Sequence, residues 1–223
     1  MSISKLFYRM GVGLMSKLRV YEERTYEYVR LFERYISGAR IILDVGCGTG
    51  AFSKAVVSRE RLVIALDIDG DALRRIENNY IEKVCADAQN LPFRDSSVDC
   101  ALAISLLEHL ESPERCVKEL YRVLRRRGVA VVQLPNLQYV FEPHSKWPLL
   151  CMMPRRFQRK IFELLKYPYV NMNVSVRRIL LELQESGFGI KEIIKVYHVG
   201  IMKLLPVAPA YIFIAVKLRS TRS

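Results

Sequence analysis

A glycine-rich turn between a short apolar run and a helix constrains the fold of this chain more than any other feature. The run 40–45 is rich in β-branched residues, and glycines follow at positions 46, 48 and 50. Glycine permits a tight turn, close approach of a ligand to the backbone and close packing of helix on strand. Asp67 ends the next apolar run, 21 residues beyond Gly46, close to the spacing at which an acidic residue binds ribose hydroxyls. The pattern predicts a nucleotide-type site after a buried strand.

Short apolar runs alternate with helical stretches along most of the chain. We expect strands at 40–45, 62–66, 81–86, 98–104, 129–134, 190–198 and 211–218. We expect helices at 3–18, 21–36, 51–58, 71–80, 113–127 and 175–186. Alternation of helices with strands that are apolar on both faces is typical of a parallel sheet covered by helices. The predicted fold class is therefore α/β, with a doubly wound, mostly parallel seven-stranded sheet whose last strand is antiparallel.

The expected domain organisation is a single domain, 1–223, built from four parts. An N-terminal helical cap occupies 1–39, and the core that carries the glycine turn occupies 40–134. A basic and aromatic lid is inserted after the fifth strand at 135–174, and the terminal helix with its two strands occupies 175–223.

Composition indicates a folded protein of a reducing compartment. Half of the residues are hydrophobic, which excludes a disordered chain and a small disulfide scaffold. The five cysteines are scattered, so neither a disulfide framework nor a metal site is expected. The N-terminal segment lacks the pattern of a signal peptide, and the longest nearly apolar run, 204–216, contains two prolines and is too short for a membrane span. We therefore expect a cytoplasmic location.

The positive charge is concentrated in the flanks. The net charge of +12 divides into +4 for residues 1–40, −1 for 41–134 and +9 for 135–223. Such flanks attract an anionic membrane surface, nucleic acid or an acidic substrate, and they are equally compatible with a solvated surface. A peripheral position at the membrane therefore stays open, as does a nucleic-acid partner, for which the chain has no motif.

The glycine turn alone leaves two cofactor classes open. The pattern Gly46-x-Gly48-x-x-Ala51 also satisfies the dinucleotide fingerprint of NAD(P)-dependent oxidoreductases. Three features argue against that class: Asp44 would lie beside a pyrophosphate, Gly50 falls where the helix should begin, and the chain lacks a second βαβαβ half for the nicotinamide.

Further motifs follow the glycine turn in a fixed order. They are Asp44-x-Gly46-x-Gly48-x-Gly50, Ala65–Asp69, Ala86–Phe93, Ser97–Asp99, Leu106–Leu110 and Glu119–Leu124, with Gly128 opening the fifth strand. In order and spacing they resemble class I S-adenosylmethionine-dependent methyltransferases, and most closely the branch that includes quinone-biosynthesis and other small-molecule methyltransferases. The resemblance covers residues 40–134 closely and the last helix and two strands more loosely.

The resemblance implies S-adenosyl-L-methionine as the cofactor and S-adenosyl-L-homocysteine as its product. It assigns cofactor contacts to Asp44, Gly46, Cys47, Gly48, Gly50, Asp67, Ile68, Asp87, Ala88 and Ser105. The backbone of the glycine turn would run along the methionine part, with Asp44 near its ammonium group. Asp67 would accept hydrogen bonds from both ribose hydroxyls.

The adenine and the amino group complete these implied contacts. Ile68 would pack on the adenine face, Asp87 would accept from the adenine amino group, and the Ala88 amide would face a ring nitrogen. Ser105 would offer its carbonyl to the amino group of the cofactor. An alternative for Asp87 is that its carboxylate caps a helix or a turn.

Methyl transfer requires little catalytic machinery, because the sulfonium is already activated and alignment supplies much of the rate. A base is needed only when the acceptor loses a proton. His109 is the candidate base, since a histidine in this stretch has that role in some small-molecule methyltransferases that the chain resembles. The alternative is a structural histidine.

The basic and aromatic insert is the candidate acceptor site. The lid residues that we expect to contact the acceptor are His144, Trp147, Arg155, Arg156 and Phe157. Apolar and basic residues fall on different faces of a helix near Phe157, which suits a lid over a small or lipid-like acceptor or an interfacial helix on an anionic bilayer. Methylation of RNA, such as tRNA, through the basic flanks is an alternative function, and a non-enzymatic binding module is a further one.

Overall fold

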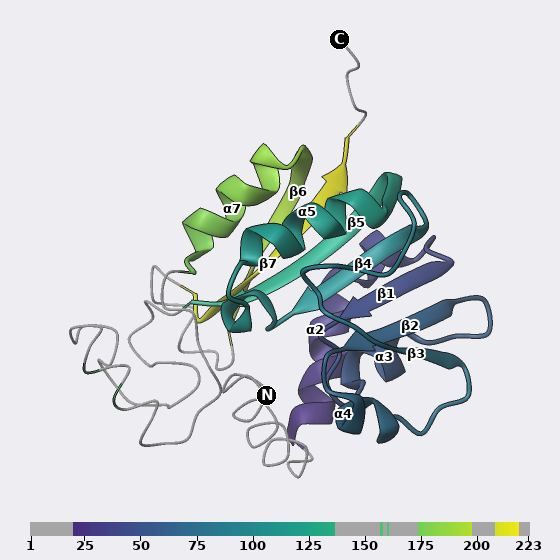
Figure 1. Cartoon of the computed structure of the whole chain (residues 1–223). Coiled ribbons are helices and arrows are strands. Elements are labelled where there is room, and N and C mark those ends of the chain that lie inside the picture. The colour runs from purple at the N-terminus through teal and green to yellow at the C-terminus, as the bar shows by residue number, and fades with distance from the viewer. Residues whose placement is uncertain (1–19, 137–156, 158–159, 161–173, 198–207, 219–223) are drawn as a thin grey trace.

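The computed structural model describes residues 20–136, 157, 160, 174–197 and 208–218 (Figure 1). Its centre is one seven-stranded sheet with the order β3-β2-β1-β4-β5-β7-β6. The strands are β1 (Ile41–Val45), β2 (Leu62–Asp67), β3 (Ile81–Cys85), β4 (Val98–Ile104), β5 (Leu124–Pro135), β6 (Phe188–Val196) and β7 (Ala210–Lys217). Neighbouring strands are parallel from β3 to β5 in this order. β7 is antiparallel to both of its neighbours, β5 and β6. The predicted sheet with an antiparallel last strand is confirmed.

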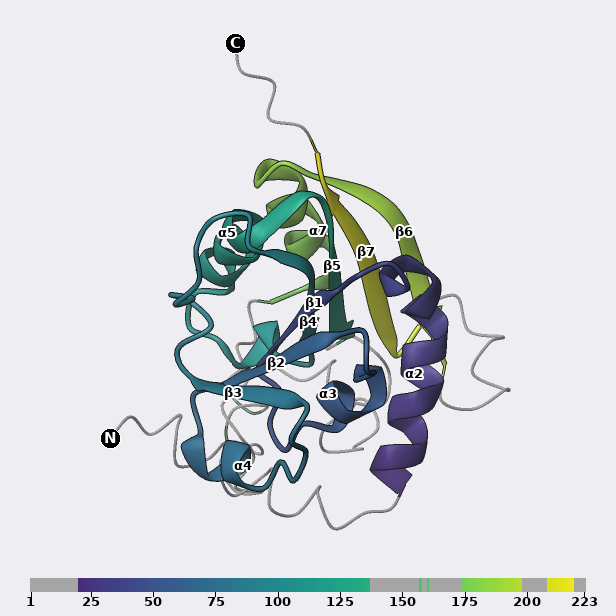
Figure 2. The ribbon, with the colours of Figure 1, turned by 90° about the vertical axis from the view of Figure 1, so that its right-hand side faces the viewer.

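Helices cover both faces of the sheet, as Figure 2 shows. The helices are α2 (Val20–Ile36), α3 (Ala51–Val56), α4 (Gly70–Arg74), α5 (Pro113–Val123) and α7 (Val176–Glu185), with a short 3-10 helix η1 (Leu107–His109). α2 and α3 lie on one face, and α5 and α7 lie on the other. The predicted helices at 21–36 and 175–186 are therefore confirmed within one or two residues.

Alternate residues of the central strands supply two separate cores. Leu43 and Val45 of β1 face α5 and α7, whereas Ile42 faces α2, and all three are fully buried. Phe32 of α2 and Leu120 of α5 are likewise fully buried. The side chains of a strand alternate between the faces of the sheet, so a strand between two helical layers must be apolar throughout. This is why the central strands read as continuous apolar runs.

Two predicted helices were too long. The helix expected at 71–80 ends at Arg74, because Asn78 accepts a hydrogen bond from the Tyr80 N–H and replaces the helical pattern with a turn. The helix expected at 113–127 ends at Val123, and β5 begins at Leu124 rather than at 129. Leu124 pairs with Val98 of β4 instead. Sheet pairing therefore outweighs the helical propensity of the Leu-Arg-Arg-Arg segment.

Contacts at the start of β5 further explain why the helix does not continue to Arg127. Arg127 has a φ of 65°, in the left-handed region that an α-helix does not contain. Arg125 is bound to Asp99 of β4 through a 2.7 Å ion pair, and Lys217 of β7 donates a 2.8 Å hydrogen bond to the carbonyl of Leu124. These contacts hold the segment in the sheet.

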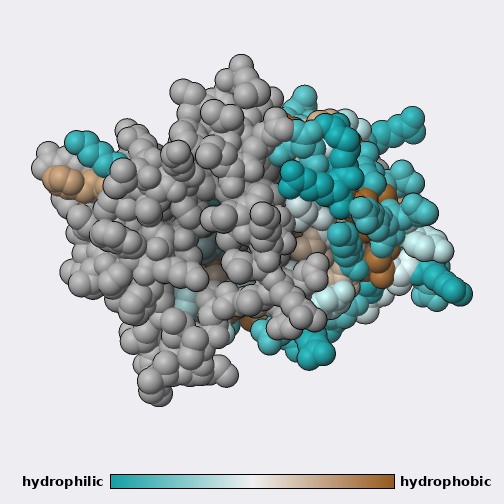
Figure 3. All heavy atoms as spheres, turned by 90° about the horizontal axis from the view of Figure 1, so that it is seen from below, coloured by the Kyte–Doolittle hydropathy of each residue, from teal (hydrophilic) through white to brown (hydrophobic). Residues whose placement is uncertain are grey.

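The helix expected at 3–18 and most of the insert at 135–174 lie outside the described residues. In the part of the chain that is described, no helix combines the length and the apolar character needed to cross a bilayer. Seen from below, the coloured surface is mostly hydrophilic with apolar areas between the polar side chains (Figure 3).

Candidate functional site

The sheet order places a topological switch point at the carboxyl end of β1. β1 has β2 on one side and β4 on the other, so successive crossovers leave the centre of the sheet in opposite directions. In open α/β sheets, ligands bind outside the strand ends at this switch point. The glycine turn follows β1 there, Asp67 ends β2, and Ser105 follows β4.

The glycine turn is tied to β2 and is packed too closely for side chains. The N–H groups of Gly46 and Cys47 both donate to the carbonyl of Leu66, at 2.7 and 3.0 Å. Gly46 has a φ of 71°, and a Cβ added to it would lie 2.6 Å from Leu106 Cδ1. Gly50 has a φ of 77°, and its Cβ would lie 2.7 Å from Ile76 Cδ1. Both positions therefore require glycine for conformation and for space.

Asp67 links the two strands that carry the site. Its side chain is 2% exposed, and Oδ2 accepts the N–H of Gly48 at 2.8 Å. Oδ1 accepts the N–H of Asp69 at 2.8 Å. The carboxylate thus fixes the glycine turn from the end of β2.

Asp44 is a buried acid directly before the turn. Its side chain is 2% exposed, and Oδ2 accepts a 2.6 Å hydrogen bond from Ser53 Oγ of α3. Burial raises the pKa of Asp44 to about 6; the hydrogen bonds from Ser53 oppose the rise and the nearby Asp67 charge adds to it. Among the described residues, no cationic side chain contributes to this pKa. A ligand cation would supply the missing partner.

Two neighbours of the turn contribute apolar character. Burial raises the pKa of the Cys47 thiol, and the charges of Asp44 and Asp67 raise it further, so this thiol stays neutral and unreactive at physiological pH. Ile68 follows β2 and is 42% exposed, which leaves an apolar surface beside the strand end.

Asp87 lies in the loop after β3 and organises that loop. Its Oδ1 accepts the N–H of Gln89 at 2.8 Å, as in the turn-capping alternative considered above, while its carboxylate stays exposed. Ala88 is buried against the core. The structure therefore shows a local hydrogen bond for Asp87. Its contact with the adenine stays a prediction.

A charged pair on α5 holds the other end of this loop. Arg122 donates to the carbonyls of Leu91 and Phe93 at 2.9 and 2.7 Å, and it forms an ion pair with Glu119. Glu119 in turn accepts the N–H of Leu91 at 2.8 Å. The bond from Arg122 is the main reason that the pKa of Glu119 is lowered. The sequence motif that contains Glu119 and Arg122 thus fixes the loop that carries Asp87.

Ser105 has a strained backbone at the end of β4. Its φ is 49°, a left-handed value that is uncommon for a residue other than glycine. Its N–H donates to the Gln133 carbonyl at 3.2 Å, and its hydroxyl pairs with Gln133 Oε1 at 2.6 Å. Two bonds to β5 therefore hold this conformation, and strain of this kind clusters at functional sites.

His109 ends η1, which follows β4 directly. Its side chain is 16% exposed, and its Nε2 lies 4.0 Å from Oε1 of Glu108. Glu108 itself is fully buried, and burial raises the pKa of its carboxyl to about 8. Leu106, on the same segment, packs over Gly46, so η1 begins beside the glycine turn.

The structure brings together most of the predicted cofactor residues. Those at the carboxyl ends of β1 and β2 or directly after them are Asp44, Gly46, Cys47, Gly48, Gly50, Asp67 and Ile68. Of the predicted lid residues, Phe157 alone is described; it is helical and 43% exposed, and His144, Trp147, Arg155 and Arg156 lie outside the described residues.

Sequence reasoning assigned no role to three polar residues of this region: Ser53, Glu108 and Gln133. Ser53 lies three residues after Gly50 and bonds to Asp44, whereas Gln133 interrupts the apolar run of β5 and bonds to Ser105. Glu108 and Gln133 could have been found in the sequence, because each is a polar residue inside an apolar run.

Comparison with known proteins agrees with this geometry. Residues 43–132 match the family described as methyltransferase domain. A probable S-adenosylmethionine-dependent methyltransferase of Mycobacterium tuberculosis is 35% identical over 113 residues, which are 50% of this chain and 41% of that protein. A probable tRNA methyltransferase 9B of Homo sapiens is 30% identical over 144 residues, 63% of this chain and 31% of that protein. The chain thus spans less than half the length of these curated relatives.

A solved structure extends the likeness to the whole fold. The crystal structure of a SAM-dependent methyltransferase from Archaeoglobus fulgidus superposes with a TM-score of 0.66 at 18% identity, covering 88% of this chain and 94% of that one. The sheet order, the glycine turn and the acid that ends β2 define a Rossmann-like α/β protein. The chain is therefore similar to S-adenosylmethionine-dependent methyltransferases, in sequence over its central part and in fold over most of its length. This similarity favours a methyl donor over the dinucleotide that the glycine pattern also permits.

Proposed function

We propose that this protein transfers a methyl group from S-adenosyl-L-methionine to a small or lipid-like acceptor. The observation that carries the proposal is the buried carboxyl of Asp44, which lies directly before the glycine turn and has no cationic partner among the described residues. The ammonium group of the cofactor is a cation of the right kind for this position. A site built for a pyrophosphate would not place an acid there.

The other cofactor contacts follow the same chemistry. We propose that the Asp67 carboxylate, which binds the N–H of Gly48, also accepts hydrogen bonds from the ribose hydroxyls, and that the exposed Ile68 offers an apolar surface to the adenine. We assign the adenine amino group to Asp87 and the cofactor amino group to the carbonyl of Ser105. Cys47 and Gly48 would contribute backbone to the methionine part.

The bound cofactor supplies an electrophilic methyl group on a sulfonium. The protein's part is to hold the acceptor in line with that methyl group and to exclude water from it. Where the acceptor carries a hydroxyl or amine that must lose its proton, His109 is the group that we propose to accept it. Its partly buried imidazole lies on the segment that begins beside the glycine turn.

We place the acceptor under the insert at 135–174, with the N-terminal cap at 1–39 beside it. The basic and aromatic composition of the insert favours an amphiphilic acceptor and supports a peripheral contact with anionic membranes. Sedimentation with anionic but not neutral liposomes, lost when Arg155, Arg156, Arg159 and Lys160 are neutralised, tests the membrane contact.

Calorimetric titration with S-adenosyl-L-homocysteine, with NADH titrated in parallel, tests the cofactor assignment. We expect binding of the first at micromolar concentration and none of the second. Binding of NADH alone would overturn the proposal. Once the cofactor is established, lipids and quinones are the first acceptors to screen.

RNA is the second candidate acceptor. The probable tRNA methyltransferase 9B matched over 144 residues and the net charge of +12 favour it. Neutralisation of several phosphates makes affinity fall steeply with salt. A steep salt dependence of tRNA binding, together with methyl transfer to tRNA, would place RNA ahead of small acceptors.

A further inference from the structure

Glu108 is the most unusual titratable residue of the described structure. Its side chain has no exposed surface, and neither carboxyl oxygen has a hydrogen-bonding partner. Burying a carboxyl group without a partner costs free energy, so such groups are rare in folded proteins and call for an explanation. An apolar side chain of similar size would fill the same space without that cost.

The position of Glu108 connects it to the proposed site. It is the central residue of η1, which starts two residues after the strained Ser105. Leu106, between Ser105 and η1, occupies the space where a Cβ of Gly46 would be. The acid is therefore carried by a segment packed on the glycine turn, not by a remote part of the core.

A second titratable group, the imidazole of the following residue, lies close to Glu108. His109 Nε2 lies 4.0 Å from Glu108 Oε1, slightly beyond hydrogen-bond distance, and the imidazole is 16% exposed. Burial dominates the pKa of Glu108, which rises to about 8, and its own backbone is the single opposing influence. No charged group among the described residues, the neutral imidazole included, contributes to that pKa.

The 4.0 Å separation of these two groups predicts that they titrate together once the imidazole carries a proton. The carboxyl is neutral at pH 7 while the imidazole is neutral, because burial disfavours its charge. A proton on the imidazole makes the neighbouring carboxylate favourable, because opposite charges about 4 Å apart attract strongly away from bulk water. The protons then belong to the pair and leave it in two shared steps.

We propose that Glu108 is a positioning residue for His109, and that the two side chains form a coupled acid–imidazole pair at the acceptor side of the methyl-transfer site. The role assigned to the pair rests on the proposed function, in which His109 accepts a proton from the acceptor. Once its own proton has been released to solvent, the Glu108 carboxylate holds the imidazole in place and stabilises its protonated form, so the proton that His109 accepts from the acceptor is the only one that moves in the transfer step.

Nuclear magnetic resonance titration of the histidine rings tests the pair without any substrate. The chain has three histidines, and His109→Gln identifies the signal of interest. In the wild type we expect His109 to titrate in two steps, the upper one at least about one pH unit above its single step in Glu108→Gln. Glu111→Gln, which removes an exposed carboxylate nearby, should leave the two steps unchanged.

Two further measurements separate this proposal from its alternatives. Glu108→Leu should raise the melting temperature, because it removes a buried polar group without a partner, and it should leave His109 with a single step. All variants should bind S-adenosyl-L-homocysteine within about twofold of the wild type, since Glu108 is not assigned to the cofactor. Failure of the wild type to bind this ligand would overturn the proposed function while leaving the titration result intact.

The pair is overturned if His109 shows the same single step in the wild type and in Glu108→Gln. It is equally overturned if Glu108→Leu unfolds the protein while Glu108→Gln leaves the His109 titration unchanged, because Glu108 would then be a structural residue only.

Discussion

The backbone N–H of Gly48 lies 2.8 Å from Oδ2 of Asp67, so the last residue of β2 is hydrogen-bonded to the turn that follows β1. The other oxygen of the same carboxylate accepts the N–H of Asp69. One side chain therefore has two tasks: it shapes the glycine turn, and in the proposed function it binds the ribose. Substitutions at this position must affect both.

Replacing Asp67 with alanine should weaken binding of S-adenosyl-L-homocysteine by about 1–3 kcal/mol, because hydrogen bonds to a charged group are lost. It should also lower the melting temperature, since the N–H groups of Gly48 and Asp69 lose their acceptor. Calorimetry and thermal unfolding measure the two effects separately. Asp71→Asn is the matched control, because Asp71 bonds to Arg74 at the surface and should change neither quantity by more than about 0.5 kcal/mol. Unchanged affinity in Asp67→Ala would refute the ribose assignment.

The substitution Gly46→Ala should destabilise the protein by about 1–3 kcal/mol. The new Cβ would lie 2.6 Å from Leu106 Cδ1, and the φ of 71° is unfavourable for alanine. Gly38→Ala is the control, since nothing lies within 4 Å of its added Cβ. Chemical denaturation checks both variants. The double variant Gly46→Ala with Leu106→Ala should relieve the steric contact with Leu106 but not the backbone strain. Full recovery of stability would therefore contradict the role assigned to the φ of Gly46.

Asp44 should couple cofactor binding to pH. Its folded pKa, about 6, lies above the ordinary value of 3.8, so the folded state holds this proton more tightly than the unfolded state. Its contribution to stability is therefore present below about pH 4 and declines as the pH rises towards 6 and beyond. The ammonium group of the ligand favours the carboxylate, so affinity for S-adenosyl-L-homocysteine should increase from pH 5 to pH 7 as the proton is released.

Asp44→Asn should remove this dependence. The variant should be at least as stable as the wild type at pH 8, should bind the ligand about tenfold or more weakly, and should show a flatter affinity profile between pH 5 and pH 7. Calorimetry in two buffers of different ionisation enthalpy counts the released protons. Equal proton release in wild type and variant would mean that another group titrates.

Arg122→Met should loosen the loop after β3 and cost about 1–3 kcal/mol of stability, because two carbonyls and two carboxylates lose their charged donor. The pKa of Glu119 is lowered in the folded protein, so the stabilising contribution of this carboxylate is present above its ordinary pKa and is lost as the pH falls through the folded value. The variant should therefore show a weaker acid dependence of unfolding between neutral pH and pH 3. Arg115→Met, an exposed arginine on the same helix, should leave both properties unchanged.

Much of the architecture follows from local patterns, because central strands that are apolar on both faces have few alternatives to a helix-covered parallel sheet. The glycine turn and Asp67 were identified for the same reason: a turn of this shape leaves few residue choices. Leu124 shows where such reasoning fails. Its neighbours suit a helix, and only the pairing with Val98, which is distant in the sequence, places it in β5.

The burial of polar groups could not be predicted from the sequence either. Glu108 was part of a recognised motif, but nothing in the motif indicates that its carboxyl has no exposed surface and no hydrogen bond. The bond from Ser53 to Asp44 likewise depends on how α3 packs on β1. Such features arise from tertiary packing, and they carry much of the proposed chemistry.

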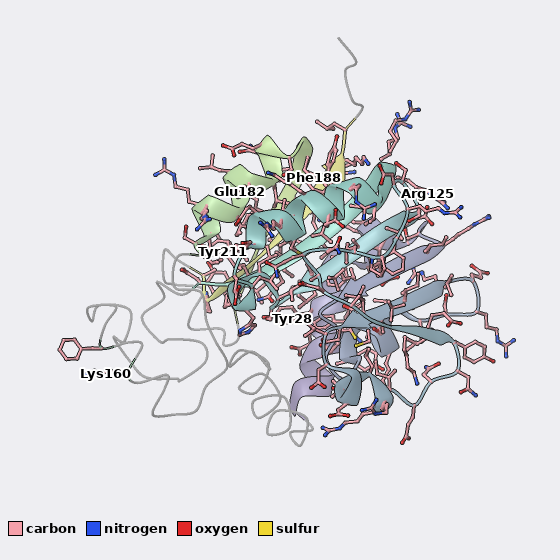
Figure 4. The ribbon with its side chains drawn as sticks, in the orientation of Figure 1. Tyr28, Arg125, Lys160, Glu182, Phe188 and Tyr211 are labelled. Carbon is pink, nitrogen blue, oxygen red and sulfur yellow. The ribbon has the colours of Figure 1, made fainter. Side chains whose placement is uncertain are left out.

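The arginines at the start of β5 have a consequence for ligand geometry. Arg125 and Tyr211 lie at opposite ends of the sheet in Figure 4, and Tyr211 pairs with Leu134 near the carboxyl end of β5. At about 3.3 Å per residue, the strand separates Arg127 from Leu134 by roughly 23 Å. A polyanion held by Arg125, Arg126 and Arg127 would span about seven stacked nucleotides, at about 3.4 Å each, before it reached the carboxyl end of β5. A compact acceptor at the proposed site would therefore not touch these arginines.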